Sequence, residues 1–491
     1  MNLRSLSIAF FSILLFPALA KRPNILVILT DDHRYDALGF LGHPFLKTPH
    51  MDRLAAEGVH FQNAYVTTSL CSPSRASILT GLYAHNHRVV DNYNPVGKSL
   101  TFFPELLQSA GYQTAFIGKW HMGDSEEKQR GFDYWLSFKG QGVYVPDPAM
   151  LKAKGRFVPQ ATNSGFNING KRVAQKGYIT DELTDYAVEW LGAKDDTKPF
   201  LLYLSHKGVH ADFLPPDRHA FKYDEVLIPT PPTPLSQPAL FTDPPMWVRN
   251  QSNSRHGVEF AYYTGVDMKK YYRRYCEALL AVDDSVGRLL GNLEKSGELE
   301  DTVILYLGDN GFIFGEHGLI DKRCAYDESI RIPMLMRYPK SLKPGTKVEK
   351  IVANIDVAPT LLEVAGLKSK ERMDGESFWQ LAKGKGSSDW RKYLLYEYYW
   401  ERNYPQTPTN HAVIGEDYKY IRYHGVWDQD ELYHTKSDPK ERKNLFNDSS
   451  QKFRITEMNK ALFDLLADSS GENMPLLRDR GTKYLHRKSG G

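Results

Sequence analysis

The sequence predicts an α/β fold, in which helices flank a doubly wound sheet, followed by a smaller C-terminal α+β unit. Uninterrupted apolar runs occupy residues 24–30, 113–118, 200–204 and 302–307, and such runs are typical of strands buried on both faces of a parallel sheet. Segments with helical spacing lie between them, and the longest covers residues 271–295. This alternation of buried strands and helices indicates a doubly wound architecture.

The sequence predicts both ends of the first connecting helix. Thr48 is a capping residue, Pro49 suits the first helical position, and Gly58 is a typical stop signal. We therefore expect a short helix over residues 50–57.

Two later stretches differ from this alternation. Residues 214–247 hold many prolines and little periodicity, which predicts a long surface excursion that could shape a substrate pocket. After about residue 386, aromatic strand-like runs at 393–400, 411–414 and 418–423 precede a helical pattern at 451–467. We therefore divide the chain into a main domain, residues 21–385, and a C-terminal subdomain, residues 386–491.

Composition narrows the class of protein. The chain has 491 residues, of which 41% are hydrophobic and 25% charged, so a disordered or fibrous protein is excluded. Lys plus Arg number 62 against 59 for Asp plus Glu, a net charge of +3. So small a surplus does not supply the field of a dedicated nucleic-acid binder.

The first twenty residues are typical of a signal peptide. Arg4 precedes an apolar run over residues 8–16, and Ala18-Leu19-Ala20 matches a cleavage site. The run is too short to span a bilayer, and no other stretch reaches that length. We therefore expect an exported protein, periplasmic or secreted, without a membrane span.

Reactive polar residues follow four of the predicted strands. They are Asp31 and Asp32, Lys119 and His121, His206 and His210, and Asp309 and Asn310. In open α/β sheets, ligands bind at the carboxyl ends of the strands. A turn would explain any one pair, but four such endings predict a functional site.

The acidic members of this set predict a metal site. Asp31, Asp32, Asp309 and Asn310 offer only oxygen atoms, which favour calcium or magnesium over zinc. Calcium tolerates irregular geometry and several carboxylates, so we expect calcium, although the spacing alone does not separate the two ions.

Cys71 immediately precedes a helix that Pro73 and Gly81 delimit. A helix amino terminus attracts anions, and Arg75, one turn further, offers two donors to an oxyanion. On these facts alone, Cys71 could be a thiolate of low pKa. The other two cysteines are Cys276, expected as a buried inert thiol, and Cys324, which could be exposed.

The run Cys71-x-Pro73-x-Arg75, followed by Ala-Ser-Ile-Leu-Thr-Gly, closely resembles the signature of formylglycine-dependent sulfatases of the alkaline phosphatase superfamily. This resemblance extends over nearly the whole chain after residue 20, through residues 24–32, 118–121, 308–311, 322, 356–360 and 431–445. It implies an alkaline-phosphatase-like mixed sheet with a C-terminal antiparallel sheet plus helix.

The resemblance also implies roles for individual residues. A formylglycine-generating or anaerobic sulfatase-maturing enzyme would convert Cys71 to formylglycine, whose hydrate attacks sulfur. The positive charges of Arg75, Lys119 and Lys322 would stabilise the sulfate oxygens, and His121 would help to deprotonate the second hydroxyl. One calcium ion would be held by five residues: Asp31, Asp32, Cys71, Asp309 and Asn310.

The leaving sugar oxygen needs a proton, and the family supplies it from a histidine in the segment that reads here as residues 205–212. We assign this role to His210 and substrate binding to His206. Asp212 stands where the family often has proline, so the choice between the two histidines stays open.

Two further groups are candidates for sugar contacts. His87 and Arg88 belong to a polar stretch, and the run over residues 85–87 is similar to that of carbohydrate sulfatases acting on glucosamine-containing glycans. Aromatic residues of the C-terminal unit either stack on sugars or pack a core; they are Tyr396, Tyr398, Tyr399, Trp400 and Tyr404.

These observations together predict an exported sulfatase that releases sulfate from polysaccharide-derived sugars, algal or glycosaminoglycan-like. The first alternative is a phosphodiesterase or phosphonate monoester hydrolase of the same superfamily. The second is a sulfated-glycan binding protein without catalysis.

Overall fold

The computed structural model describes nine stretches of the chain: residues 22–123, 126–152, 165–234, 236–249, 267–386, 388–401, 404, 407–425 and 428–475. The predicted signal peptide, residues 1–20, lies outside them.

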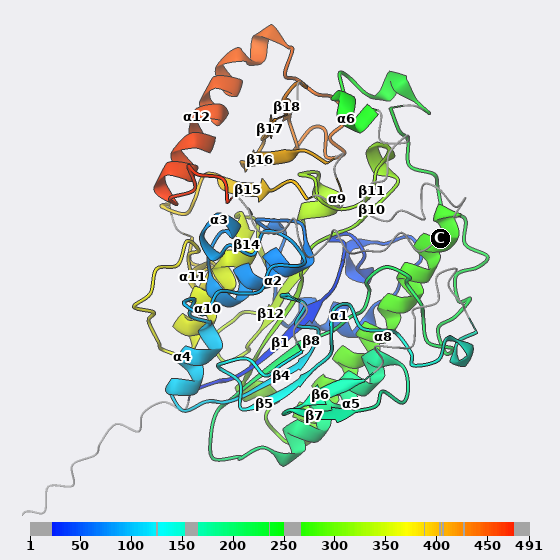
Figure 1. Ribbon diagram of the computed structural model, residues 1–491, viewed down its shortest axis with the longest axis vertical. Coiled ribbons are helices and arrows are strands. Elements are labelled where there is room, and N and C mark those ends of the chain that lie inside the picture. The colour runs from blue at the N-terminus through cyan, green and yellow to red at the C-terminus, as the bar shows by residue number, and fades with distance from the viewer. Residues whose placement is uncertain are drawn as a thin grey trace, which may run out of the picture.

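A ten-stranded mixed sheet forms the centre of the main domain (Figure 1). Its order is β13 (Thr346–Val348), β2 (Val59–Phe61), β12 (Met334–Arg337), β9 (Thr302–Gly308), β1 (Asn24–Thr30), β8 (Phe200–Ser205), β4 (Gln113–Gly118), β5 (Tyr134–Ser137), β6 (Phe166–Ile168) and β7 (Lys171–Val173). The four predicted strands are β1, β4, β8 and β9, which are adjacent and parallel. Strand β12 runs antiparallel to β9, so the sheet is mixed.

Helices cover both faces of this sheet, as the alternating sequence pattern predicts. Side chains of β1 alternate between two hydrophobic cores: Ile25, Val27 and Leu29 enter one, and Leu26 and Ile28 enter the other. The first core includes α2 (Cys71–Thr80), α4 (Phe103–Ser109) and α10 (Val357–Val364), and the second includes α1 (Pro49–Glu57), α5 (Ile179–Ala193) and α8 (Met268–Lys295). Figure 1 shows α5 and α8 on one side of the sheet and α2 and α10 on the other.

The C-terminal unit is an antiparallel sheet with one long helix. Its strands are β15 (Leu394–Tyr398), β16 (Thr409–Ile414), β17 (Lys419–His424) and β18 (Glu431–Tyr433), and α12 (Lys452–Asp468) packs on them. Tyr396 and Tyr398 are fully buried and join the same core as α2. These two tyrosines therefore pack the core and do not stack on sugars, whereas Trp400 is half exposed.

The proline-rich stretch is irregular where the structure describes it. It contains only the 3₁₀ turn Pro238–Leu240 and part of the four-residue helix α6 (Met246–Arg249). Leu227 in this stretch is exposed, so the expected surface excursion is confirmed. Among the described residues, no helix is both long and apolar enough to cross a bilayer.

The end of β4 requires glycine. Gly118 has φ of +123°, and a Cβ placed on it would lie 1.8 Å from the carbonyl oxygen of Ser205 on β8. This close approach brings Lys119 into the ladder, where its N–H donates to the same carbonyl at 2.8 Å. The glycine therefore sets where the next side chain projects.

We expect Gly118→Ala to lower the free energy of unfolding by at least about 3 kcal/mol, because backbone strain and a clash add. The matched control is Gly170→Ala, which shares a positive φ (+89°) but has no atom within 4 Å of the new Cβ, and costs about 1–2 kcal/mol. Denaturant titration of both variants measures the difference, and equal losses would contradict the close-approach argument.

Candidate active site

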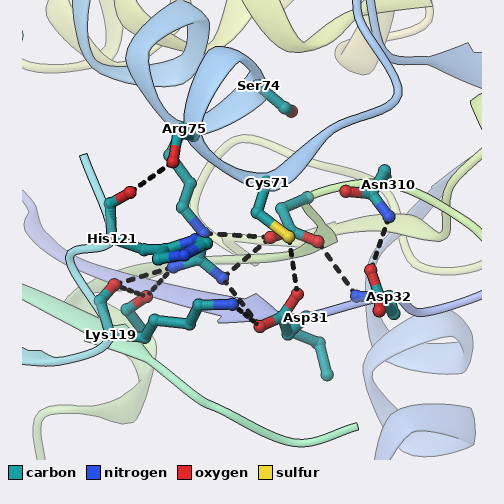
Figure 2. A network of polar contacts seen from close by, with 12 residues as sticks. Asp31, Asp32, Cys71, Ser74, Arg75, Lys119, His121 and Asn310 are labelled. Atoms are coloured by element: carbon teal, nitrogen blue, oxygen red, sulfur yellow. Dashed lines mark hydrogen bonds and ion pairs between the residues drawn. The ribbon is translucent and has the colours of Figure 1, made fainter. Parts of the chain in front are cut away.

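The carboxyl ends of the central strands bring the predicted polar residues together (Figure 2). Asp31 and Asp32 follow β1, Lys119 follows β4, and Asp309 and Asn310 follow β9. All five are buried with no measurable exposure. Charged groups at such depth are retained only when they pair with one another or bind an ion.

Cys71 is the first residue of α2 and lies at the centre of this cluster. Its thiol donates to Asp31 Oδ1 at 3.4 Å and accepts from Lys322 Nζ at 3.2 Å. Helix α2 is buried along its whole length and ends at Gly81, which has a positive φ of 71°. The helix is therefore fixed in the core, and its amino terminus points Cys71 at the strand ends (Figure 2).

The Cys71 thiol is not a ready nucleophile. Burial, and then the negative charge of Asp31, raise its pKa to about 12. The hypothesis of a low-pKa thiolate is therefore wrong, because desolvation outweighs the nearby lysines. Cys276 and Cys324 are also buried, so the suggestion that Cys324 is exposed is wrong as well.

Three cations neutralise the carboxylates. Lys119 forms an ion pair with Asp31, and Lys322 forms one with Asp32. Although burial opposes ionisation, the positive charge of Lys119 and its neighbours holds the pKa of Asp31 well below its usual range. Each predicted cation thus has a carboxylate partner inside the cluster.

The Arg75 guanidinium contacts three strand ends, and one of its terminal nitrogens makes no hydrogen bond. Its Nε donates to Asp309 Oδ2 at 2.9 Å, and one terminal nitrogen donates to the Lys119 carbonyl at 2.7 Å and the Ser205 hydroxyl at 2.6 Å. The other terminal nitrogen lies 2.8 Å from Asp309 Oδ2. This planar fork joins α2 to the ends of three strands, which a lysine does not do.

The acidic residues fit a divalent metal ion. Ligand oxygens of Asp31, Asp32 and Asp309 lie within 4.8 Å of one another. Asp32 Oδ2 and Asn310 Oδ1 are buried without a hydrogen-bond partner. Burial raises the pKa of Asp32 to about 7, although the positive charge of Lys322 lowers it. The negative charges of Asp31 and Asp309 raise it further. A cation would satisfy both orphaned oxygens and relieve this repulsion.

Two of the predicted histidines adjoin the cluster. A ring nitrogen of His210 lies within 4.8 Å of ligand atoms of Asp31 and Cys71. His121 has a left-handed backbone (φ 60°), and its buried Nδ1 has no hydrogen-bond partner. Burial, and then the charge of Lys119, lower the pKa of both rings, so both are neutral at pH 7.

His206 and His87 are not brought to the cluster. The ring of His206 points to the opposite face of the sheet, where Nε2 lies 3.1 Å from Ser285 Oγ on α8. His87 uses both ring nitrogens, with Ser77 Oγ at 3.1 Å from Nε2 and the Val89 N–H at 3.1 Å from Nδ1. His87 therefore has no ring nitrogen left for a substrate, and its expected role is corrected. For His206 only Nε2 is engaged, because its buried Nδ1 has no hydrogen-bond partner, so its substrate-binding role stays a prediction.

The rest of the 85–88 segment divides between structure and surface. His85 Nδ1 lies 2.7 Å from Glu397 Oε2 of β15, and Asn86 Nδ2 donates to the Ser469 carbonyl at 2.8 Å. These contacts fasten α3 (Ala84–His87) to the C-terminal unit. The side chain of Arg88 is exposed, and its substrate-binding role stays a prediction.

The roles of Arg323 and Glu401 beside Lys322 were not predicted from the sequence. Arg323 Nε donates to Glu401 Oε1 at 2.8 Å, and its guanidinium lies 3.7 Å from the Tyr404 ring centroid. The run Asp321-Lys322-Arg323 was the available signal, because three consecutive charges in a buried segment require partners.

Family comparison agrees with this geometry. The sulfatase family model matches residues 23–367, and the model described as N-sulphoglucosamine sulphohydrolase, C-terminal, matches residues 315–468.

This chain belongs to the sulfatase family. It is therefore a sulfuric ester hydrolase, and the resemblance noted in its sequence is confirmed.

Three similar proteins are informative. An N-acetylglucosamine-6-O-sulfatase of Bacteroides thetaiotaomicron is 33% identical over 91% of this chain and 86% of its own length. The human N-acetylglucosamine-6-sulfatase is 31% identical over 79% of this chain and 69% of its own. A solved structure in complex with its substrate D-glucosamine-2-N,6-O-disulfate has a TM-score of 0.79 and 31% identity, covering 93% of this chain and 99% of the other. The predicted alkaline-phosphatase-like fold is confirmed.

The raised thiol pKa predicts chemical behaviour. In the unconverted folded chain, iodoacetamide at pH 7.5 should leave all three cysteines unmodified over an hour, because each is buried and protonated. Mass spectrometry before and after denaturation counts the labels, with the denatured chain as control. Rapid labelling of Cys71 in the folded chain would restore the thiolate hypothesis.

Proposed function

We propose that this sulfatase releases sulfate from sulfated sugars, with the 6-O-sulfate of glucosamine-type residues as the first candidate. The observation that carries the proposal is Cys71 at the amino terminus of α2, in contact with Asp31 and Lys322. The names of the two relatives with the glucosamine 6-sulfate activity support the sugar.

Conversion of Cys71 to formylglycine by a maturing enzyme would supply an oxygen nucleophile at this position, and the buried, protonated thiol is the precursor. The sulfate ester would lie against Arg75, Lys119 and Lys322. Figure 2 shows Arg75 and Lys119 beside Cys71, and Lys322 Nζ donates to the Cys71 thiol at 3.2 Å. Charge-assisted donors of this kind stabilise negative charge on the sulfate oxygens as it develops.

Five residues would hold the metal: Asp31, Asp32, Asp309, Asn310 and residue 71 itself. The all-oxygen carboxylate and amide set supports calcium, which would polarise the sulfate oxygens as a Lewis acid when bound. Asp32 Oδ2 and Asn310 Oδ1 are the free acceptors that it would occupy.

Proton transfer falls to the two histidines. His210 adjoins Cys71 and is partly exposed, and we assign to its protonated form, which the negative charge of a bound sulfate ester favours, the protonation of the leaving sugar oxygen. Its backbone is fixed because Tyr144 donates a hydrogen bond to the His210 carbonyl at 2.8 Å. His121, on the Lys119 side of the cluster, would accept the proton from the nucleophile in the second half of the reaction.

The remaining parts of the proposal concern the whole protein. The pattern in residues 1–20 supports export to the periplasm or medium. We keep the division into a catalytic domain, residues 21–385, and a C-terminal subdomain, residues 386–491.

The decisive experiment is sulfate release by protein coexpressed with a maturing enzyme. Glucosamine 6-sulfate and sulfated algal oligosaccharides serve as substrates, and ion chromatography detects sulfate. We expect Cys71→Ala to lose at least about 10³-fold in kcat, because the nucleophile is gone. Cys276→Ala, a buried cysteine on α8, is the matched control and should keep activity.

Each alternative has its own signature in this assay. Turnover of phosphonate or phosphate diesters without sulfate release would favour the phosphoester hydrolase. Binding of sulfated glycans with no turnover, unchanged in Cys71→Ala, would favour the binding protein.

Metal removal tests the cation site independently of turnover. Dialysis against EDTA should lower the midpoint of thermal unfolding, because a ligand at 100 times its Kd stabilises the folded state by about 2.7 kcal/mol. Calcium should restore the midpoint better than magnesium. Asp309→Asn should abolish the calcium response, whereas the surface control Asp301→Asn should keep it. An equal response in both variants would refute the site.

A further inference from the structure

Lys207 is a buried cation that the proposed chemistry does not use. The residue is only 2% exposed, yet its ammonium forms no ion pair or hydrogen bond with the described residues. Its Nζ lies 4.7 Å from the centroid of the Tyr144 ring. A buried charge without a partner costs free energy, and a ligand of opposite charge that pairs with it would remove this cost.

The backbone places Lys207 beside the active site. Strand β8 ends at Ser205, and the segment after it stays next to the end of β1, through the His206 N–H to the Leu29 carbonyl at 2.8 Å and the Asp31 N–H to the Gly208 carbonyl at 3.0 Å. The His210 N–H donates to the Lys207 carbonyl at 2.9 Å. The Tyr144 ring beside Lys207 Nζ carries the hydroxyl that donates to the His210 carbonyl, so Lys207 adjoins His210.

Electrostatics agree with this placement. Burial lowers the pKa of Lys207 to about 8, and the charges of Asp212, Lys119, Asp31 and Asp32 all act on it. Asp212 forms no ion pair with Lys207, and burial raises the pKa of that carboxyl. Lys207 therefore lies within the field of the catalytic cluster without a partner in it.

A count of charges shows what is missing. Asp31, Asp32 and Asp309 balance Arg75, Lys119 and Lys322 through their ion pairs. Lys207 and Asp212 add one charge of each sign beside this balanced set, but they form no ion pair with each other. One scissile sulfate ester supplies a single negative charge for Arg75, Lys119 and Lys322, so Lys207 is left to pair with a second anionic group of the substrate.

We propose that Lys207, with the Tyr144 ring, forms a second anion subsite that binds a sulfate or carboxylate group of the same substrate, beside the scissile sulfate. Tyr144 positions both Lys207 and His210, because its ring lies beside Lys207 Nζ and its hydroxyl donates a hydrogen bond to the His210 carbonyl. The proposal rests on the proposed function and extends it: the enzyme selects doubly anionic sugars.

The test compares three substrates of the converted enzyme: D-glucosamine-6-O-sulfate, D-glucosamine-2-N,6-O-disulfate, and a 6-sulfated glucosamine linked to a uronic acid. The unsubstituted enzyme should prefer one or both of the doubly anionic sugars. We expect Lys207→Met to lower kcat/KM for the preferred sugar ~10- to 100-fold, mainly through KM, because a desolvated charge pair is lost. The monosulfated sugar should change less than about threefold, and Lys207→Arg should retain most of the preference.

The disulfate and uronic acid arms distinguish a second sulfate on the same sugar from a carboxylate on its neighbour. Lys222→Met is the matched control, because Lys222 is exposed and also faces a tyrosine ring, 6.0 Å from the Tyr223 centroid. A similar loss on all three substrates, or no preference in the unsubstituted enzyme, would overturn the subsite.

Calorimetric titration of Cys71→Ala with the same three sugars measures binding without turnover. If Lys207→Met, added to Cys71→Ala, removes the difference in affinity between the monosulfated and the doubly anionic sugars, the subsite is supported. This result stands even if the enzyme releases no sulfate from any sugar, an outcome in which only the proposed function fails. Equal affinities for all three sugars in Cys71→Ala would overturn the subsite. Thermal unfolding of Lys207→Arg separates lost binding from lost folding.

Discussion

The buried charge cluster around Cys71 is the constraint on which the rest of the structure depends. Lys119 pairs with Asp31, and Arg75 pairs with Asp309, in a region without measurable exposure of the carboxylates. Breaking one such pair leaves an uncompensated buried charge, at a cost of ~3–5 kcal/mol. The strand ends, the start of α2 and the Lys322 segment must therefore keep their relative positions. The same interactions that would bind sulfate also hold the sheet edge together.

The C-terminal unit is part of this arrangement, because it holds the segment that carries Lys322. The Ala325 carbonyl accepts from Lys419 Nζ of β17 at 2.9 Å, and the Tyr326 hydroxyl donates to Glu431 of β18 at 2.7 Å. Without the small sheet, these buried groups would lose their partners and Lys322 its fixed backbone. The four-stranded sheet thus supports one cation of the proposed catalytic site, which explains why its tyrosines face the core.

Sequence reasoning predicted the central strands and most of the cluster because both follow local rules. Strands β1, β4, β8 and β9 are buried on both faces and read as continuous apolar runs, and their ends meet by the geometry of parallel sheets. The short antiparallel strand β12, four residues long, depends on long-range pairing that leaves no periodic signal. His206 was assigned by its closeness to a strand end, but its position one residue after Ser205 turns the ring to α8. Burial of Cys71, which sets its pKa, is a property of the packed core and not of the helix terminus alone.

The arrangement also explains why the reaction can be predicted from the sequence but the identity of the substrate sugar cannot. The residues proposed to bind the sulfate lie on strand ends and on α2, where the sheet and the core fix the backbone on both sides. Groups outside the cluster with free surface lie on connecting segments, such as exposed Arg88 and half-exposed Trp400. Loops vary without disturbing a scaffold, so a family keeps its chemistry while its substrates change. Lys207 is an intermediate case, since it lies in a buried segment next to His210 and its ammonium has no ion-pair partner among the described residues. A specificity residue at that position would be as rigid as the catalytic ones, and its selectivity would come from an unpaired charge in place of a shaped loop.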